Sequence, residues 1–385
     1  MSDSKSFCIL ANKIYTPFKC IDNGFMIVEN GIIKDVGPKT KLKRRNLEIL
    51  DFKDHIIAPG FIDIHIHGIA GGYTMDAKIE SIEKMVKALA LHGVTSFLPT
   101  LEPASIEVLK KALETIILAK EKNIGAKIAG INLEGPFLNI EKAGGVKKEY
   151  LRPPSIKEFN ELYEFSHKTI KIITIAPELP KGIEFIRYAS SLGIVVSIGH
   201  TNATYKETIE AIKNGASHVT HLFNAMRGLH HREPGVIGAV LENPNVTVEL
   251  ISDLIHLHPS IIRLVYQIKP IESIITVTDS VFADMPEGIQ KIWEWEIIIK
   301  NNMAILPDGT LVGSVLTLDK ALRNLVFKIG IPIENALQTM TINPAKIIRL
   351  DKKIGSIEKG KLADFIVMDE KLNIKKTFIN GKEFN

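Results

Sequence analysis

The residues best suited to chemistry are histidines and carboxylates that stand at the ends of apolar runs. The most specific of them are His65 and His67 in FIDIHIHG. Residues two apart on a strand point to the same face, so both imidazoles can converge on one metal ion. Gly68, Gly71 and Gly72 follow and permit the tight turn that a strand end needs. The pattern therefore favours a pair of metal ligands over two histidines on a surface loop.

Three more ligand candidates end apolar runs elsewhere in the chain. Glu134 ends INLE directly before Gly-Pro, and a carboxylate in such a place is costly to bury unless it is paired or binds a cation. His200 follows SIG and His221 follows HVT, and either one alone would more often be a hydrogen-bonded core histidine. Together the three form a nitrogen and oxygen set that suits Zn²⁺ or Fe²⁺ and leaves one position open for water, which indicates catalysis.

Asp279 closes the apolar run IITVTD and is the candidate proton carrier. Beside a divalent ion, the pKa of this carboxyl should stay low, and the carboxylate could accept a proton from a metal-bound water. The alternative is a structural aspartate that caps the turn at Ser280. The ligand candidates around it favour the catalytic role.

Two further segments look suited to holding a substrate. HLFNAMRGLHHREPG offers Asn224, the backbone amide of Ala225, and Arg232, which could grip an anion with two hydrogen bonds. A surface pair with Glu233 is an equally good explanation of that arginine. The second segment, DLIHLHP, contains two histidines, 256 and 258, followed by a proline. We expect one of these histidines to face the site and a helix to open at the proline.

Strands that precede these residues must position them. Apolar runs of strand length recur at 61–66, 95–99, 127–133, 171–176, 194–199, 218–222, 246–252 and 274–279. Amphipathic stretches lie between most of them, as at 81–93, 105–122 and 204–216, with Ser81 as a start signal and Gly93 and Gly215 as stop signals. This alternation predicts a (β/α)₈ barrel, with a doubly wound open sheet as the alternative. In a barrel, the carboxyl ends of the strands would bring the candidate residues together.

The two ends of the chain differ from this alternating middle. β-rich runs meet at Asn30-Gly31 near the start and at Asn380-Gly381 near the end, and both dipeptides are type I′ hairpin signals. We therefore expect one small β-sandwich domain assembled from both termini beside a metal-dependent hydrolase barrel. The expected boundaries are 1–57 plus 345–385 for the small domain and 58–344 for the barrel.

Composition excludes several classes of protein. The 385 residues are 45% hydrophobic and 24% charged, which is ordinary for a globular enzyme, and the net charge of +4 is too small to indicate nucleic-acid binding. No run of 18 apolar residues occurs and the N-terminus lacks a secretion signal, so no membrane association is expected. Two cysteines cannot build a disulfide framework or a thiolate metal site, and we expect a cytoplasmic protein.

Seven segments in order resemble the amidohydrolase superfamily: PGFIDIHIHG, INLEGPF, SIGHTNATY, THLFNAM, REPGVIGAVL, VTDS and GSIEKGKLADFIVMD. Within it, they are most similar to the N-acetylglucosamine-6-phosphate deacetylases, from about residue 24 to the end. The resemblance implies a (β/α)₈ barrel with a small β-sandwich from both termini. It also implies an enzyme of amino-sugar catabolism, which converts this sugar phosphate to glucosamine-6-phosphate and acetate with a divalent metal.

The resemblance also assigns metal ligands. Glu134, His200 and His221 would hold the main ion, most simply zinc, with iron as the alternative. His65 and His67 would help to hold a second ion, because some members that lack this pair work with one. The resemblance thus implies one or two ions per subunit.

It assigns the remaining roles in the same way. Asp279 would be the general base and then the acid that protonates the leaving amine. The sugar phosphate would be bound by Asn224, the Ala225 amide, Arg232 and His256. The family takes this arginine from the neighbouring subunit, which implies a homodimer.

Two positions depart from the family pattern. Val146 stands where the family has a histidine that helps to polarise the acetamide carbonyl, and loss of such a donor costs on the order of 10²–10³ in rate. A second metal, Lys147 or His230 could take over this role. Leu254 replaces a glycine ahead of His256 and would shift that histidine.

Three other functions stay open. The first is deacetylation of the epimer, N-acetylgalactosamine-6-phosphate. The second is hydrolysis of a cyclic amide, as in dihydroorotases and hydantoinases. It is disfavoured because the fourth strand ends ITIAPELP, without the lysine that many of those enzymes carboxylate. The third is a catalytically weakened sugar-phosphate-binding paralogue, which Val146 would favour.

Overall fold

The computed structural model describes residues 6–16, 18–43 and 46–384, and its centre is a barrel of parallel strands. In sheet order the barrel runs β15-β14-β13-β12-β11-β10-β8-β5. Its strands are β5 (Phe61–Ile66), β8 (Val94–Leu101), β10 (Ile131–Glu134), β11 (Ile170–Ile175), β12 (Val195–Ile198), β13 (Ala216–Val219), β14 (Thr247–Ile251) and β15 (Ile274–Val277). A parallel bridge between Ser280 and Ile66 closes the ring. The predicted barrel is confirmed, and the open-sheet alternative is wrong.

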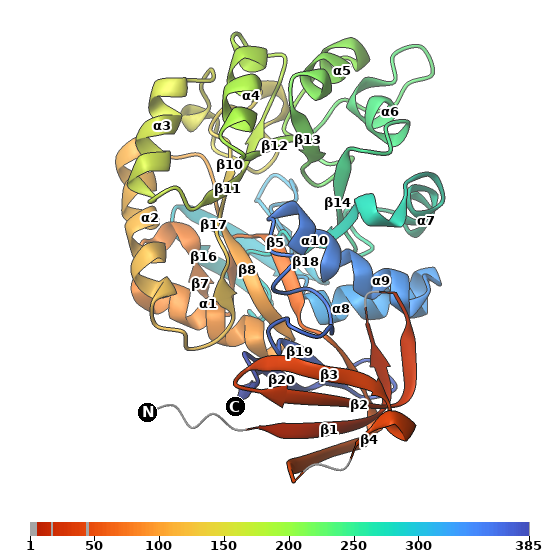
Figure 1. Ribbon diagram of the computed structural model, residues 1–385. Helices are drawn as coiled ribbons and strands as arrows, with labels where there is room; N and C mark the ends of the chain where they lie inside the picture. The colour runs from red at the N-terminus through yellow and green to blue at the C-terminus, as the bar shows by residue number, and fades with distance from the viewer. Residues whose placement is uncertain (1–5, 17, 44–45, 385) are drawn as a thin grey trace.

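Helices surround the barrel and stand between successive strands (Figure 1). In chain order they are α1 (Ile79–Leu91), α2 (Ile106–Lys120), α3 (Ile156–Phe165), α4 (Gly182–Ser191), α5 (Tyr205–Lys213), α6 (Gly235–Leu241), α7 (Pro259–Ile268), α8 (Leu318–Arg323), α9 (Ile333–Thr339) and α10 (Ile342–Ile347). A π-helical stretch, Asn324–Ile329, continues α8. No helix among the described residues is long and apolar enough to cross a membrane.

Both glycines that the sequence predicted as helix stop signals follow a helix end. Gly93 and Gly215 follow α1 and α5 with φ of 82° and 115°, the left-handed region that glycine tolerates. The start signal at Ser81 is wrong, because α1 begins two residues earlier, after Lys78. The Ser81 hydroxyl instead donates to Asp76 at 2.8 Å, which satisfies it within the first turn.

Three of the predicted strands end or break earlier than expected. The run 218–222 forms a strand only to Val219, and 274–279 only to Val277. His221 and Asp279 have φ of 29° and 48°, which a strand cannot contain. The run 127–133 splits into β9 (Lys127–Ile128) and β10.

Both ends of the chain form one seven-stranded sheet with the order β21-β20-β19-β4-β1-β2-β3. Its strands are β1 (Phe7–Tyr15), β2 (Cys20–Glu29), β3 (Ile32–Pro38), β4 (Glu48–Pro59), β19 (Phe365–Met368), β20 (Ile374–Ile379) and β21 (Lys382–Phe384). The red and blue strands lie together below the barrel in Figure 1. Asn30, Gly31, Asn380 and Gly381 all have positive φ, so both hairpin turns are confirmed. The domain boundaries stay a prediction, since β4 and α10 span them.

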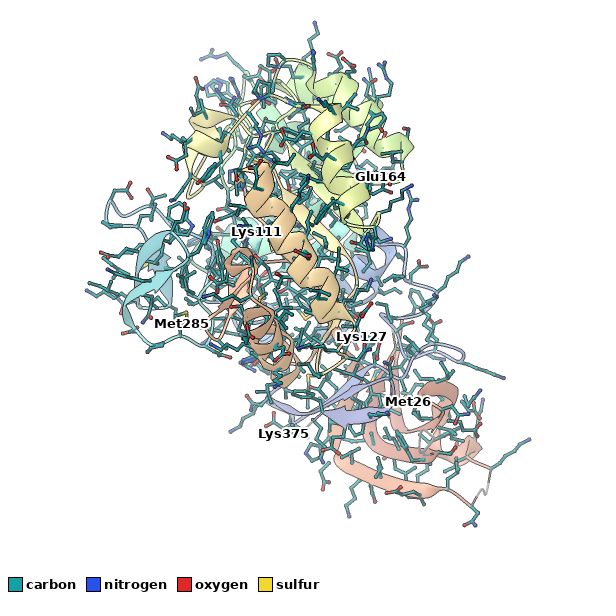
Figure 2. All side chains as sticks on the ribbon, turned by 90° about the vertical axis from the view of Figure 1, so that its left-hand side faces the viewer. Met26, Lys111, Lys127, Glu164, Met285 and Lys375 are labelled. Carbon is teal, nitrogen blue, oxygen red and sulfur yellow. The ribbon has the colours of Figure 1, made fainter. Side chains whose placement is uncertain are left out.

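The small sheet docks at the end of the barrel where the strands begin. Lys127, at the start of β9, forms an ion pair with Asp364, and the Gly60 N–H donates to the Asp364 carbonyl at 3.0 Å. Figure 2 shows Lys127 between α2 and this sheet. The carboxyl ends of the strands, at the other end of the barrel, are therefore free to carry the site.

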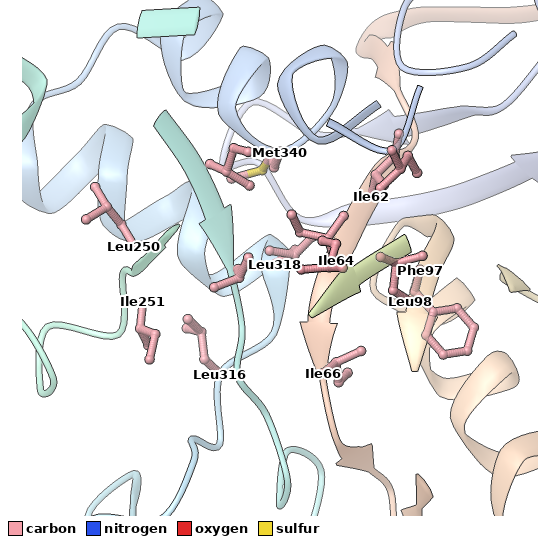
Figure 3. Packing of buried hydrophobic residues seen from close by; sticks show 14 of the residues in the cluster. Ile62, Ile64, Ile66, Phe97, Leu98, Leu250, Ile251, Leu316, Leu318 and Met340 are labelled. Atoms are coloured by element: carbon pink, nitrogen blue, oxygen red, sulfur yellow. The ribbon is translucent and has the colours of Figure 1, made fainter. Parts of the chain in front are cut away.

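Strand β5 shows how the core positions the site. Ile62, Ile64 and Ile66 are buried, and Figure 3 shows them among side chains such as Leu318 and Met340, which come from α8 and the end of α9. Alternate residues point to opposite faces of a strand, so Asp63, His65 and His67 take the other face. Burial of the apolar face therefore fixes the direction in which the polar side chains point.

Candidate active site

Six side chains gather at the carboxyl ends of the barrel strands, in two groups that could each hold a metal ion. All six are less than 10% exposed. One group comprises Glu134, His200 and His221, and the other comprises His65, His67 and Asp279. These are the six residues that the sequence predicted as metal ligands and proton carrier.

The spacing of the first group suits a tetrahedral ion. Glu134 Oε1 lies 3.0 Å from Nε2 of both His200 and His221, and these two nitrogens are 3.1 Å apart. Four ligands at about 2.0–2.1 Å from zinc would be separated by roughly 3.3 Å. The donor atoms therefore nearly outline one face of such a tetrahedron.

The donor atoms of the second group are slightly farther apart. His65 Nε2 and His67 Nε2 are 3.3 Å apart, and Asp279 Oδ1 lies 3.4 and 3.3 Å from them. Glu134 Oε2 is 3.2 Å from His67 Nε2, so this carboxylate presents one oxygen to each group. Glu134 could therefore contribute to both groups, and the residues present fit divalent cations.

The electrostatics of the cluster favour positive charge. Burial by itself lowers the pKa of His67, but hydrogen bonds to Asp279 and Glu134 raise it to about 9. Burial likewise raises the pKa of Asp279, yet the charge of His65 and the hydrogen bond to His67 hold it below its usual value. A divalent cation satisfies this demand as well as protons do.

Backbone strain accompanies three of these residues. His200, His221 and Asp279 have φ of 46°, 29° and 48°, which is uncommon for residues with a side chain. Hydrogen bonds hold them there: Asn139 N–H donates to the His200 carbonyl, and Asp279 N–H donates to the His65 carbonyl, both at 2.9 Å. The turns aim each side chain back over the barrel mouth.

A cavity of about 240 Å³ opens above the two groups. Asn224, Ala225 and His256 line one part of it, as predicted for substrate contacts. His256 is held by Asp253, whose Oδ2 lies 2.6 Å from His256 Nδ1. Arg232 is exposed on the loop and does not line the cavity, so its substrate contact stays a prediction.

His256 is the histidine of its pair that faces the site. His258 instead caps α7, which opens at Pro259 as expected, because His258 Nδ1 accepts a hydrogen bond from the Ser260 N–H at 3.2 Å. Leu254 has φ of 68°, a left-handed conformation that explains why a glycine would suit this position.

The opposite part of the cavity comes from a hairpin that the sequence did not predict. Strands β16 (Gly288–Ile292), β17 (Trp295–Lys300) and β18 (Met303–Ile305) form a separate sheet. In Figure 2, it lies beside Met285, away from Met26 of the small sheet. Trp295 lines the cavity and its indole N–H donates to Glu102 Oε1 at 3.1 Å. The hairpin therefore reaches the site through one tryptophan.

The chain is similar to known proteins in sequence and in structure. The sequence profile of the amidohydrolase family matches residues 56–384. The chain belongs to the amidohydrolase family. It is 34% identical to the N-acetylglucosamine-6-phosphate deacetylase of Bacillus subtilis, over 98% of this chain and 97% of that protein. It is 31% identical to the N-acetylgalactosamine-6-phosphate deacetylase of Escherichia coli O157:H7, over 97% of each.

Solved structures agree with this placement among the amidohydrolases. The N-acetyl-D-glucosamine-6-phosphate deacetylase of Mycobacterium smegmatis, solved as a mutant in complex with N-acetyl-D-glucosamine-6-phosphate, superposes with a TM-score of 0.93 at 28% identity. The match covers 99% of each chain. As an amidohydrolase, this chain is a hydrolase that acts on an amide bond, and its two ligand groups are the candidate metal site.

The structure narrows what could replace the histidine absent from this amidohydrolase at position 146. Val146 lines the cavity, but Lys147 turns away to pair with Glu294 and to lie over Trp295, 5.4 Å from its ring centre. His230 is exposed and does not line the cavity. Unlike these two side chains, the second ligand group lies at the cavity, where His67 and Asp279 line it.

Sequence analysis missed several buried carboxylates of this amidohydrolase, among them Asp63, Glu102 and Glu249. Glu249 lies within the apolar run VTVELIS and Glu102 within TLEP. A charged residue inside a buried strand, as Glu249 is, or directly after one, as Glu102 is, is costly to bury unless it is paired, and this signal could have identified both. Asp63 accepts from the Thr278 hydroxyl at 2.6 Å and ties β5 to the residue that follows β15.

Proposed function

We propose that the protein hydrolyses N-acetylglucosamine-6-phosphate to glucosamine-6-phosphate and acetate, as part of amino-sugar catabolism. The observation that carries this proposal is the pair of three-ligand groups that share Glu134 beneath one cavity. Nearly full-length relatives and structural neighbours that bear this activity in their names support it. A single-chain cavity of this size suits a small molecule rather than a polymer.

The proposed cofactor is zinc, with two ions per subunit. Glu134, His200 and His221 would hold one ion, and His65 and His67 would hold the other beside Asp279, because the donor spacings fit tetrahedral coordination. Zinc in such a place supplies a Lewis acid that polarises the amide carbonyl and makes water a better nucleophile at neutral pH.

Asp279 moves the proton in this proposal. Its carboxylate accepts a proton from water as the water oxygen bonds to the acetyl carbon. It then returns that proton to the sugar nitrogen as the carbon–nitrogen bond breaks, since an amine leaves only when protonated. Acetate and the free amino sugar result. The lowered pKa of Asp279 supports its starting state as a base.

We further propose a homodimer in which Arg232 binds the phosphate in the neighbouring subunit's site. Among the described residues that line the cavity, there is no lysine or arginine, although a phosphate dianion calls for one. Arg232 lies on an exposed loop with Leu229, a large apolar residue that is 58% exposed. Asn224, the Ala225 amide and His256 would hold the rest of the sugar. The cytoplasm, where Cys8 and Cys20 stay reduced, is the proposed location.

Acetate release from the purified, zinc-loaded protein tests the function. We expect turnover of N-acetylglucosamine-6-phosphate that is lost after chelation and restored by zinc. The N-acetylgalactosamine-6-phosphate epimer, the substrate named for one relative, is run in parallel, and faster turnover of it would reassign the substrate. Absence of acetate with every divalent metal tried would refute a deacetylase and favour the sugar-phosphate-binding paralogue.

A further inference from the structure

A buried carboxylate outside the ligand set contacts that set from below. Glu249 lies in the middle of β14, is fully buried, and belongs to neither of the two ligand groups. We infer that Glu249 is a positioning residue that turns His65 toward the second metal ion. This inference rests on the proposed metal site.

The first step concerns the two nitrogens of His65. Its Nε2 faces His67 and Asp279 at 3.3 and 3.4 Å, so this atom must be free of hydrogen to bind an ion. Its Nδ1 lies 2.8 Å from Glu249 Oε2. A carboxylate at that distance accepts the Nδ1–H and fixes the tautomer and the ring orientation that a metal ligand needs.

The second step is that no other histidine ligand has such a partner. His200 Nδ1 contacts a neutral backbone carbonyl, that of Lys142, at 2.9 Å. His67 and His221 have no hydrogen-bond partner at Nδ1 within the described chain. Among the imidazoles of the ligand histidines, only that of His65 has a carboxylate at Nδ1, so loss of this carboxylate should weaken the second metal site more than the first.

The third step is that the carboxylate itself is held in place. Its other oxygen, Oε1, lies 3.0 Å from Nε2 of His218, in β13. Oε2 also accepts from the His221 backbone N–H at 3.1 Å. Glu249 is fully buried and has three hydrogen-bond donors, which offset the cost of its burial. Side chains that point into a barrel are more usually apolar, so a carboxylate at the position of Glu249 is unusual.

The test measures metal binding rather than turnover. We expect the wild-type protein to bind two zinc ions, measured by elemental analysis and by competition with a chelator. Glu249→Met removes the acceptor at similar size and should lower the affinity for the second ion by about 10- to 100-fold, while the first ion stays within about threefold. Glu249→Gln keeps an acceptor without charge and should lower it by about tenfold.

Thr276→Val is the matched control. Thr276 is a fully buried polar residue on the neighbouring strand β15, and its hydroxyl pairs with Thr339 at 2.8 Å, away from any ligand. This variant should keep both ions. If Glu249→Met lost both ions equally, and the control variant lost them to the same extent, Glu249 would have only a structural role. That result would overturn the inference.

The remaining outcomes are also decisive. Should Glu249→Met fail to fold, the nearly isosteric Glu249→Gln carries the test, and second-ion affinity equal to wild type would overturn the inference. A wild-type protein that binds two ions but releases no acetate would sink the proposed function and leave the positioning role intact. A wild-type protein that binds only one ion would remove the second site and the inference with it.

Discussion

Asp279 contacts the ligand histidines His65 and His67 and also lines the cavity. Its substitution can therefore separate proton transfer from metal binding. Asp279→Asn keeps the size and one oxygen but cannot take a proton. We expect kcat to fall by about 10²- to 10⁴-fold. The ion held by Glu134, His200 and His221 should remain, as elemental analysis of the same sample would record.

Asp54→Asn is the control for this change, because Asp54 is exposed on β4 in the small sheet. It should leave both kcat and metal content at wild-type values. Near-normal acetate release by a well-folded Asp279→Asn variant would remove this residue from proton transfer.

Val146 offers a second prediction at the scale of single residues. If a second ion does the work of the absent histidine, Val146→His should change kcat of the two-metal enzyme by less than about tenfold. In a His67→Ala background, where the second site is damaged, the same change should restore activity on the order of 10²-fold. Steady-state acetate release from all four combinations gives the comparison.

A large gain from Val146→His alone would contradict this prediction. It would mean that the missing donor already limits the natural enzyme. The result would also weaken the case for a second ion, which rests on the spacing of His65, His67 and Asp279.

At this scale, sequence alone identified most polar residues near the carboxyl ends of the barrel strands, but it missed Glu102 after β8 and Glu249 inside β14. His65, Glu134 and Asp279 were visible because a polar residue after an apolar run has few structural reasons to be there. The role of Glu249 was hidden although its charge within an apolar run was visible, since its partners His65 and His218 are 184 and 31 residues away and only the closed barrel brings them together. Long-range pairing of this kind leaves no local pattern.

Among the elements, His92 links three segments and should make stability depend on pH. It ends α1 and contacts Asp319 of α8 at 3.0 Å and Asp284, after β15, at 2.7 Å. Burial lowers the pKa of His92, but hydrogen bonds to Asp284 and Asp319 raise it to about 9. A raised pKa means that the folded state binds the proton more tightly than the unfolded state does.

This stabilisation should be complete below about pH 6.5 and should disappear as the pH rises through about 9. His92→Gln removes it, so the wild-type advantage in unfolding free energy should be about 1–2 kcal/mol larger at pH 6 than at pH 9.5, after allowance for partial exposure. Urea unfolding at the two values measures this. His258→Gln, at another helix end, is the control, and an advantage independent of pH would contradict the link.

The order of elements was predictable because each strand and helix has its own local period. The ends were less so, and the reason is tertiary. β13 and β15 stop at Val219 and Val277 because the next residues turn back toward the site, a conformation that neither period nor propensity encodes. The hairpin around Trp295 lay outside the predicted barrel for a similar reason: it is stabilised by Glu102, far away in the chain.

For the whole molecule, the proposed exchange of Arg232 between subunits predicts complementation. Asp279→Asn and Arg232→Ala dimers should each be nearly inactive toward the phosphorylated sugar. In a mixed dimer, one site would have Asp279 from its own chain and Arg232 from the other, which restores one intact site. Random mixing after subunit exchange should therefore recover about a quarter of wild-type activity.

Acetate release from the mixture, compared with the two separate variants, measures this recovery. Sedimentation of the wild-type protein should give the mass of a dimer in the same buffer. A mixture no more active than its components, although mixed dimers have formed, would mean that the arginine acts within its own chain or not at all.

The place of β4 in the small sheet has a consequence for the order in which the chain is made. This strand lies between β1, which is synthesised before it, and β19, which begins at Phe365. At about 5–20 residues per second, the roughly 300 residues between Pro59 and Phe365 take about 15–60 s to leave the ribosome. Throughout that time, one edge of β4, which includes Ile56 and Ile57, is not paired with β19. This edge is covered only when the last strands emerge. A nascent chain that stalls within the barrel would therefore expose an unpaired, aggregation-prone strand edge.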